Sequence, residues 1–228
     1  MGHPQLIVML THHDHTVVNA AEIFEACKHS RAQYWGFKEE GLPLEQMKAL
    51  FASMKACGKT TVLEVVAYTE GQCLCGAQIA AQCGCDILMG TLFFDSVNDY
   101  CKAKELKYMP FVGTISQRPS ILEGTLEEML QQAETYLKKG VYGLDLLGYR
   151  YTGDAQALIR QFVSRVDAPV CVAGSINSME RVNLVAECGA WSFTIGGAFF
   201  ENRFGGSFAQ QIDRICDHLD AAALTCAG

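Results

Sequence analysis

The sequence predicts a (β/α)8 barrel that forms one domain over residues 1–228. Short apolar runs, typical of buried parallel strands, alternate along the chain with amphipathic stretches typical of helices. Eight such pairs share 228 residues, which leaves about 28 residues for each pair, as in a compact barrel. The eight runs are Leu6–Thr11, Ala32–Lys38, Thr61–Ala67, Asp86–Gly90, Tyr108–Gly113, Val141–Leu147, Pro169–Gly174 and Ala190–Gly196.

An open, doubly wound sheet is the alternative fold. Such a sheet usually has about five or six strands and a Gly-rich turn after the first strand. The first run here leads into residues 11–15, Thr-His-His-Asp-His, which contain no glycine. The barrel is therefore the better prediction, and functional residues are expected where its strands end and the following loops begin.

Capping residues mark the ends of the amphipathic stretches. Pro43 and Gly58 are expected to bound the second helix. Thr125 and Glu128 have the spacing of a capping box. Asn177 is expected to cap the seventh helix. The last helix is predicted from an apolar seam made by Phe208, Ile212, Ile215 and Leu219.

Composition and charge exclude several classes of protein. The chain has 18 Lys and Arg against 25 Asp and Glu, a formal net charge of −7, and no basic cluster that would follow a nucleic-acid backbone. No apolar stretch approaches the length of about 18 residues that a membrane span requires, and the first residues lack the basic start of a secretory leader. We therefore expect a cytoplasmic protein that binds neither nucleic acid nor a membrane.

The 11 cysteines are expected to be reduced. With 50% hydrophobic residues, the chain can bury a core without disulfide bonds. Cys73 and Cys75, like Cys83 and Cys85, are separated by one residue, unlike the paired cysteines of zinc knuckles. We interpret them as buried apolar side chains and expect neither a metal ion nor a cofactor. Self-association into a homo-oligomer is left open.

Glycine-containing loops after the seventh and eighth runs predict a phosphate site. Gly174 and Ser175 follow one run, and Gly196, Gly197 and Ala198 follow the other. Glycine allows an anion to approach backbone N–H groups, and a short helix over residues 198–202 would direct its N-terminus toward that anion. Barrels of this type commonly bind phosphate with the loops after strands 7 and 8. The alternative is that each glycine only forms a turn.

Three charged residues are candidates for catalysis. Lys38 ends the second run, where it can polarise a ligand; a Schiff-base role fits less well, because class I aldolases on related barrels usually place that lysine on strand 4 or 6. Glu64 and Asp145 each interrupt an apolar run, so they are expected to face partners inside the barrel with altered proton affinity. We expect both to take part in proton transfer. The alternative is a structural ion pair, such as Glu64 with Lys38.

A histidine-rich segment follows the first run. His13 and His15 resemble the metal pair of amidohydrolase barrels, but no other histidine ends a strand, so a binuclear metal site is not expected. We expect His12 to contact substrate, and Asp14 is an alternative cap for the next helix. Arg150 follows the sixth run, where its guanidinium group can donate a forked pair of hydrogen bonds to phosphate.

The second half of the chain resembles the ribulose-phosphate-binding barrels and, among them, the N-acylmannosamine-6-phosphate 2-epimerases. The shared layout runs from Thr125 to Ala198. It includes residues 147–152 after the sixth strand, the Ala-Gly strand end at 173–174 and the Ile-Gly-Gly-Ala segment at 195–198. The resemblance implies a barrel with a phosphate site.

The acid and base residues of that epimerase family are not matched. Its strand 3 carries a lysine where this chain has Glu64 and Tyr68, and its strands 5 and 7 carry carboxylates where this chain has Thr114 and Gly174. A second, looser resemblance over residues 87–113 is to the glycerol-3-phosphate-responsive antiterminators, which share the barrel and the phosphate site but act on RNA. The acidic charge balance argues against that activity here.

These residues together predict an enzyme that acts on a small phosphorylated sugar or acid. The expected chemistry is that of an isomerase, epimerase or lyase with an enediolate-like intermediate. The loops after the seventh and eighth runs would hold the phosphate, while Lys38, Glu64 and Asp145 would act at the reacting carbons. The alternative is a non-catalytic regulatory barrel that binds a phosphorylated metabolite.

Overall fold

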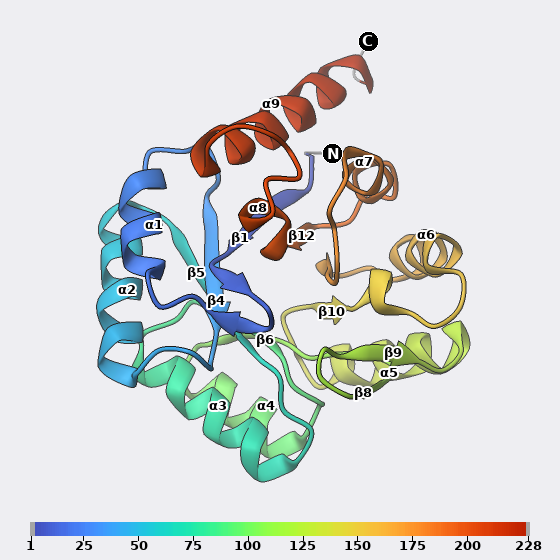
Figure 1. The fold of residues 1–228 in the computed structure, drawn as a ribbon. Helices are drawn as coiled ribbons and strands as arrows, with labels where there is room; N and C mark the ends of the chain where they lie inside the picture. Colours follow the sequence, from blue (N-terminus) through green and yellow to red (C-terminus); the bar gives the residue numbers. More distant parts are fainter. Residues whose placement is uncertain (1–2, 227–228) are drawn as a thin grey trace.

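Eight parallel strands form a nearly closed barrel in the computed structural model, which describes residues 3–226, and this confirms the predicted fold (Figure 1). The eight strands coincide with the eight predicted runs. They are β1 (Gln5–Met9), β4 (Tyr34–Lys38), β5 (Thr60–Val65), β6 (Ile87–Gly90), β7 (Lys107–Met109), β10 (Leu144–Leu146), β11 (Val170–Val172) and β12 (Ser192–Ile195).

The strands follow one another around the barrel in chain order. Hydrogen-bonded ladders run continuously from β10 through β11, β12, β1, β4, β5 and β6 to β7. The gap between β7 and β10 is spanned by a single parallel bridge from Phe111 to Asp145, in which the Asp145 N–H donates to the Pro110 carbonyl oxygen at 2.9 Å. Because β7 is short, this bridge replaces a full ladder.

Helices surround the strands, as Figure 1 shows. No helix within residues 3–226 has the length and apolar character needed to cross a membrane. The helices are α1 (Ala20–Cys27), α2 (Leu44–Ala56), α3 (Glu70–Gln82), α4 (Asp95–Ala103), α5 (Leu126–Lys138), α6 (Ala155–Arg165), α7 (Met179–Glu187), α8 (Gly197–Phe200) and α9 (Phe208–Cys226), with a 3-10 turn at Gly148–Arg150.

The caps agree with the sequence pattern in two helices and differ in a third. Pro43 is the N-cap of α2, and Thr125 forms both hydrogen bonds of a capping box with Glu128. Helix α7 is capped by Ser178, whose side chain accepts a hydrogen bond from the N–H of Arg181, and not by Asn177 as predicted. Asn and Ser are both common N-cap residues, so the sequence alone could not decide between positions 177 and 178.

Two short hairpins were not predicted. One follows β1 and consists of β2 (Thr11–His12) and β3 (His15–Thr16); the other follows β7 and consists of β8 (Thr114–Ser116) and β9 (Ile121–Glu123). Strands of two or three residues are too short to produce a period-2 pattern. Both hairpins lie at the carboxyl end of the barrel strands, where they extend the loops expected to bind ligand.

Alternation along the strands divides the core into two clusters. One cluster packs between the strands and the helices, and a smaller one fills the barrel interior. On β4 and β5 the last residues that face the interior are charged. Gly36 of β4 pairs with Val62 of β5, and two residues later Lys38 pairs with Glu64. The interior cluster consists of Ile7, Met9, Val62, Ile87, Met89, Met109 and Cys171.

The paired cysteines are mostly buried, as predicted. Cys73, Cys83 and Cys85 are buried, whereas Cys75 is exposed. Cys73 and Cys75 both lie in α3, where residues two apart point to different faces of the helix. The prediction that these four cysteines are buried is therefore wrong for Cys75 and confirmed for the other three.

Two glycines of α3 provide a test of the packing between α3 and β5. A methyl group at Gly76 would lie 2.4 Å from Cγ1 of buried Val65, whereas one at Gly71 would meet nothing within 4 Å. We expect Gly76→Ala to lower the free energy of unfolding by about 1–3 kcal/mol through overpacking. Gly71→Ala should raise it by about 0.5–1 kcal/mol through helix propensity. Urea denaturation measures both, and changes of the same sign would contradict this packing.

Candidate functional site

A cavity of about 620 Å³ opens at the carboxyl end of the barrel strands. Its walls come from the loops after β1, β10, β11 and β12, from the ends of β4 and β5 and from the turn between β8 and β9. Nine of the ten predicted site residues line it, and Asp145 does not. Those nine are His12, Lys38, Glu64, Arg150, Gly174, Ser175, Gly196, Gly197 and Ala198.

One side of the cavity presents unoccupied backbone donors. Within the described part of the chain, no acceptor receives the N–H groups of Gly174, Ser175, Gly196, Gly197 or Ala198. The last two begin α8, which covers residues 197–200 and so starts one residue earlier and ends two residues earlier than predicted. Free N–H groups that line one wall of a cavity are suited to an anion.

Neighbouring atoms leave no room for a side chain at two glycines of this wall. A Cβ atom at Gly174 would lie 2.6 Å from Cγ of Arg150, and one at Gly196 would lie 2.8 Å from the Thr11 carbonyl oxygen. Gly174 also has a φ of +87°, which disfavours other residues. A turn role and close packing therefore both contribute to the choice of glycine.

Arginine side chains add positive charge on the same side. Arg150 ends the 3-10 turn after β10 and has no ion pair or side-chain hydrogen bond to any residue that the structure describes. Arg181, which the sequence analysis missed, donates to the carbonyl oxygen of Ser175 and lies 4.6 Å from the ring centroid of Tyr149. The nearby Glu201 is paired with Arg203 at 2.9 Å.

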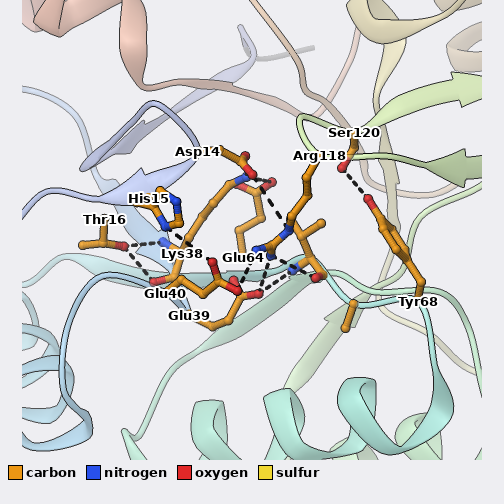
Figure 2. A network of polar contacts seen from close by, with 12 residues as sticks. Asp14, His15, Thr16, Lys38, Glu39, Glu40, Glu64, Tyr68, Arg118 and Ser120 are labelled. Atoms are coloured by element: carbon orange, nitrogen blue, oxygen red, sulfur yellow. Dashed lines mark hydrogen bonds and ion pairs between the residues drawn. The ribbon is translucent and has the colours of Figure 1, made fainter.

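The opposite side of the cavity is built around Lys38 (Figure 2). Only 7% of Lys38 is exposed, and its ammonium group contacts the carboxylate of Asp14 and lies 3.6 Å from that of Glu64. Burial lowers the pKa of Lys38, but the carboxylates of Glu64 and Asp14 outweigh burial and raise the pKa above its usual value. The charged form of the amine is therefore favoured, and the ion pair of Lys38 with Glu64, which was the structural alternative to catalysis, is present.

The β2–β3 turn places Asp14 beside this lysine. His13 and Asp14 both have positive φ, 49° and 67°, as the two central residues of a tight hairpin turn often do. Asp14 does not cap the next helix, because the N-cap of α1 is Asn19. The Thr16 hydroxyl completes the attachment by donating to the Lys38 carbonyl oxygen at 2.7 Å and accepting the Lys38 N–H at 2.9 Å.

Arg118 connects the second hairpin to the same cluster and was not predicted. It lies in the turn between β8 and β9, and its guanidinium group contacts Glu39 at 2.9 Å and Glu40 at 2.6 Å. Burial raises the pKa of Glu39, and Arg118 acts in the opposite direction. Tyr68 supports this turn, since its hydroxyl lies 2.7 Å from the side-chain oxygen of Ser120.

Asp145 lies inside the barrel beneath the cavity. It is fully buried, and neither carboxylate oxygen has a hydrogen-bond partner among the described residues. Burial and the negative charge of Glu64 raise its pKa well above the usual value. The backbone N–H of Gly90, which does not meet hydrogen-bond geometry, and the charge of Lys38 oppose this only in part. The protonated form of Asp145 is therefore favoured.

The histidines approach the cavity in different ways. The His12 ring stacks on Phe200 at 5.2 Å and lies close to Gly197, and its Nε2 is buried without a partner among the described residues. His15 pairs with Glu40 at 3.4 Å. Among the side chains that the structure describes, which end at residue 222, no group of three or more His, Cys, Asp or Glu residues is arranged to hold a metal ion.

Comparisons with known proteins identify the fold. No protein-family model and no curated protein matches the chain. An orotidine 5'-phosphate decarboxylase from Pyrococcus horikoshii OT3 superposes with a TM-score of 0.70 at 15% identity, over 95% of this chain and 99% of that one. An N-acetylmannosamine-6-phosphate 2-epimerase from Clostridium perfringens gives 0.63 at 18% identity, over 93% and 92%.

A glycerol uptake operon antiterminator regulatory protein from Listeria monocytogenes is also similar. Its TM-score is 0.58 at 16% identity, over 83% of this chain and 90% of that one. At such identities the likeness establishes the fold alone. The resemblance to ribulose-phosphate-binding barrels that the sequence suggested is confirmed at that level.

The burial of Asp145 predicts a particular dependence of stability on pH. Because its pKa is raised in the folded state, the unfolded chain releases this proton first as the pH rises above about 4. We therefore expect the wild type to lose free energy of unfolding relative to Asp145→Asn as the pH rises from 4 toward the raised pKa. Urea denaturation at pH 4, 5, 6, 7 and 8 measures this difference.

Asp86 provides the matched control. Burial acts to raise its pKa, but Lys55 and two hydrogen bonds from Thr61 outweigh burial and lower the pKa. The pKa of Asp86 is shifted in the direction opposite to that of Asp145. The free energy of unfolding by which the wild type exceeds Asp86→Asn should therefore be lost as the pH falls. A wild type whose difference from Asp145→Asn stays constant with pH would show that Asp145 is ionised in the folded state.

Proposed function

We propose that this protein is an enzyme that binds a small phosphorylated compound and rearranges or cleaves it through an enediolate-like intermediate. One observation supports this most directly. A single cavity has free backbone N–H groups and Arg150 on one side, and the ion pair of Lys38 and Glu64 on the other. The first side fits a phosphate group, and the second fits a carbon acid next to a carbonyl group.

The phosphate group would accept hydrogen bonds from the N–H groups of Gly174, Ser175, Gly197 and Ala198. Arg150 would add a charge-assisted, forked pair of hydrogen bonds. Because Arg150 has no competing partner among the described residues, binding phosphate breaks no ion pair. His12, beside Gly197, would contact the same end of the ligand.

At the other end, Glu64 would remove the proton from the carbon next to the carbonyl group. The electron pair of that C–H bond moves to the carbonyl oxygen. Because Glu64 becomes neutral as it takes the proton, the charge of the Lys38 ammonium is no longer offset by Glu64 and can stabilise the new negative charge. Return of the proton to the opposite face or to the neighbouring carbon gives an epimer or an isomer. Asp145, protonated beneath the cavity and electrostatically coupled to Glu64, would supply or hold the second proton.

The solved structures support the general class of ligand. Those of similar fold include proteins named as an orotidine 5'-phosphate decarboxylase and an N-acetylmannosamine-6-phosphate 2-epimerase. A second candidate function is non-catalytic binding of a phosphorylated metabolite, which the antiterminator regulatory protein of similar fold favours. The cysteines from Cys27 to Cys216 are free thiols, which fits the proposed location in a reducing cytoplasm.

Binding of the anion is tested at Gly197. An aspartate there would place negative charge against the N–H groups and beside His12. We expect Gly197→Asp to weaken the binding of inorganic phosphate about tenfold or more, as measured by isothermal titration calorimetry. Gly71→Asp adds the same charge on the exposed surface of α3 and should leave binding unchanged. Unchanged affinity in Gly197→Asp would show that the phosphate site is assigned wrongly.

Catalysis is tested by the exchange of substrate hydrogen for solvent deuterium in a panel of aldose and ketose phosphates. The wild type should introduce deuterium next to the carbonyl carbon, as measured by NMR. Asp145→Asn should lower that rate about 100-fold or more while ligand affinity is largely kept, because it removes a proton and leaves the cavity wall intact. Lys38→Ala should weaken both binding and exchange.

The same experiment separates the two candidate functions. A regulatory barrel would bind members of the panel without deuterium incorporation. Full exchange in Asp145→Asn would show that Asp145 is structural. Loss of folding in both variants, with ligand binding in the wild type but no exchange, would favour the regulatory function.

A further inference from the structure

We infer that the ligand of this cavity carries its negative charge at the phosphate end only, and that its other end is a polyol, a carbonyl or an amino group rather than a carboxylate. This inference rests on the proposed function and narrows the substrate class from phosphorylated sugars and acids to phosphorylated sugars and amino sugars. It follows from the way charge is divided between the two sides of the cavity.

The phosphate side of the cavity has arginine charge that is not paired with a carboxylate. Arg150 lines the cavity without a partner among the described residues, and Arg181 reaches the Ser175 carbonyl from the neighbouring helix. The acidic residue on this side, Glu201, is neutralised by Arg203 at 2.9 Å. One dianionic group is therefore balanced at this end.

On the opposite side of the cavity, both cations are already paired with carboxylates. Lys38 and Arg118 both line the cavity, and Figure 2 shows both inside one network of carboxylates. Lys38 contacts Asp14 and lies 3.6 Å from Glu64. The network thus sets two cations against four carboxylates, with Arg118 in contact with Asp14, Glu39 and Glu40.

Because the carboxylates are largely buried, their excess negative charge acts strongly on a ligand in the cavity. The side chains of Asp14, Glu39 and Glu64 are exposed by only 19%, 14% and 16%, so water screens them weakly. A ligand carboxylate here would gain no free cation and would meet like charges. Hydroxyl and ammonium groups, in contrast, can donate hydrogen bonds to Asp14 and Glu64, the two carboxylates of the network that line the cavity.

The cavity histidines set the condition for a test. His12, His13 and His15 line the cavity, and His15 lies 3.4 Å from Glu40. Protonated imidazoles would add positive charge and reduce the discrimination. The measurement is therefore made at pH 8, above the range in which imidazole side chains ordinarily titrate.

Two matched pairs of probes test the inference by calorimetry. Glucitol 6-phosphate is compared with 6-phosphogluconate, and glycerol 3-phosphate with 3-phosphoglycerate, all in competition with inorganic phosphate. Each pair keeps the phosphate and the number of carbons and differs by a carboxylate at the far end. We expect the acid of the pair that fits the cavity to bind at least about tenfold more weakly than its neutral partner.

Asp14→Asn removes one carboxylate that contacts both cations and keeps its shape. It should reduce the discrimination between the two members of a pair by about threefold or more, since a charge of Lys38 becomes available. Asp95→Asn is the matched control: it makes the same change in an exposed pair with Lys139 outside the cavity and should leave the discrimination unchanged.

The outcomes separate this inference from the proposed function. An acid that binds as tightly as its neutral partner, or an Asp14→Asn variant that discriminates as the wild type does, would overturn the inference while leaving the phosphate site in place. Failure of all four probes and of inorganic phosphate to bind would overturn the phosphate site, and the inference with it. Equal effects of Asp14→Asn and Asp95→Asn would assign the discrimination to net charge and also overturn it.

Discussion

The buried ammonium group of Lys38 is the interaction on which the mouth of the barrel depends. A charged amine with 7% of its residue exposed must be paired, and its partners come from two different parts of the chain. Asp14 brings the β2–β3 hairpin to the end of β4, and Glu64 brings β5. Arg118 then attaches the β8–β9 turn to the carboxylates that follow Lys38. One ion-pair network therefore fixes both hairpins and shapes one side of the cavity.

The strands explain why this network lies where it does. Interior positions alternate along each strand, so the apolar cluster that fills the lower barrel gives way to charge two residues later, at Lys38 and Glu64. The change occurs at the carboxyl end, where loops add polar groups and solvent is accessible. The phosphate side differs because its donors are backbone N–H groups and depend on Gly174 and Gly196 having no side chain.

The sequence predicted the eight strands and most of the cavity wall because both leave regular signals. Apolar runs repeat along the chain, and glycines after strands stand out. Arg118 and Arg181 left weaker signals, since each acts through a turn or a neighbouring loop. Pro119 indicates a turn beside Arg118, but the flanking strands, Thr114–Ser116 and Ile121–Glu123, are too short to give the pattern of a hairpin. The free guanidinium of Arg150 and the missing partners of Asp145 are tertiary properties that no sequence pattern specifies.

Asp145 bears most directly on the choice between an enzyme and a regulatory barrel. A fully buried carboxyl group without hydrogen-bond partners among the described residues costs stability, and a protein that only binds phosphate has no use for it. An apolar residue would fill the same space in the barrel at lower cost. The proposed proton transfer would give a reason to keep such a group, because its raised pKa favours holding a proton near the charge of Glu64. The cost of Asp145 therefore favours catalysis over binding alone.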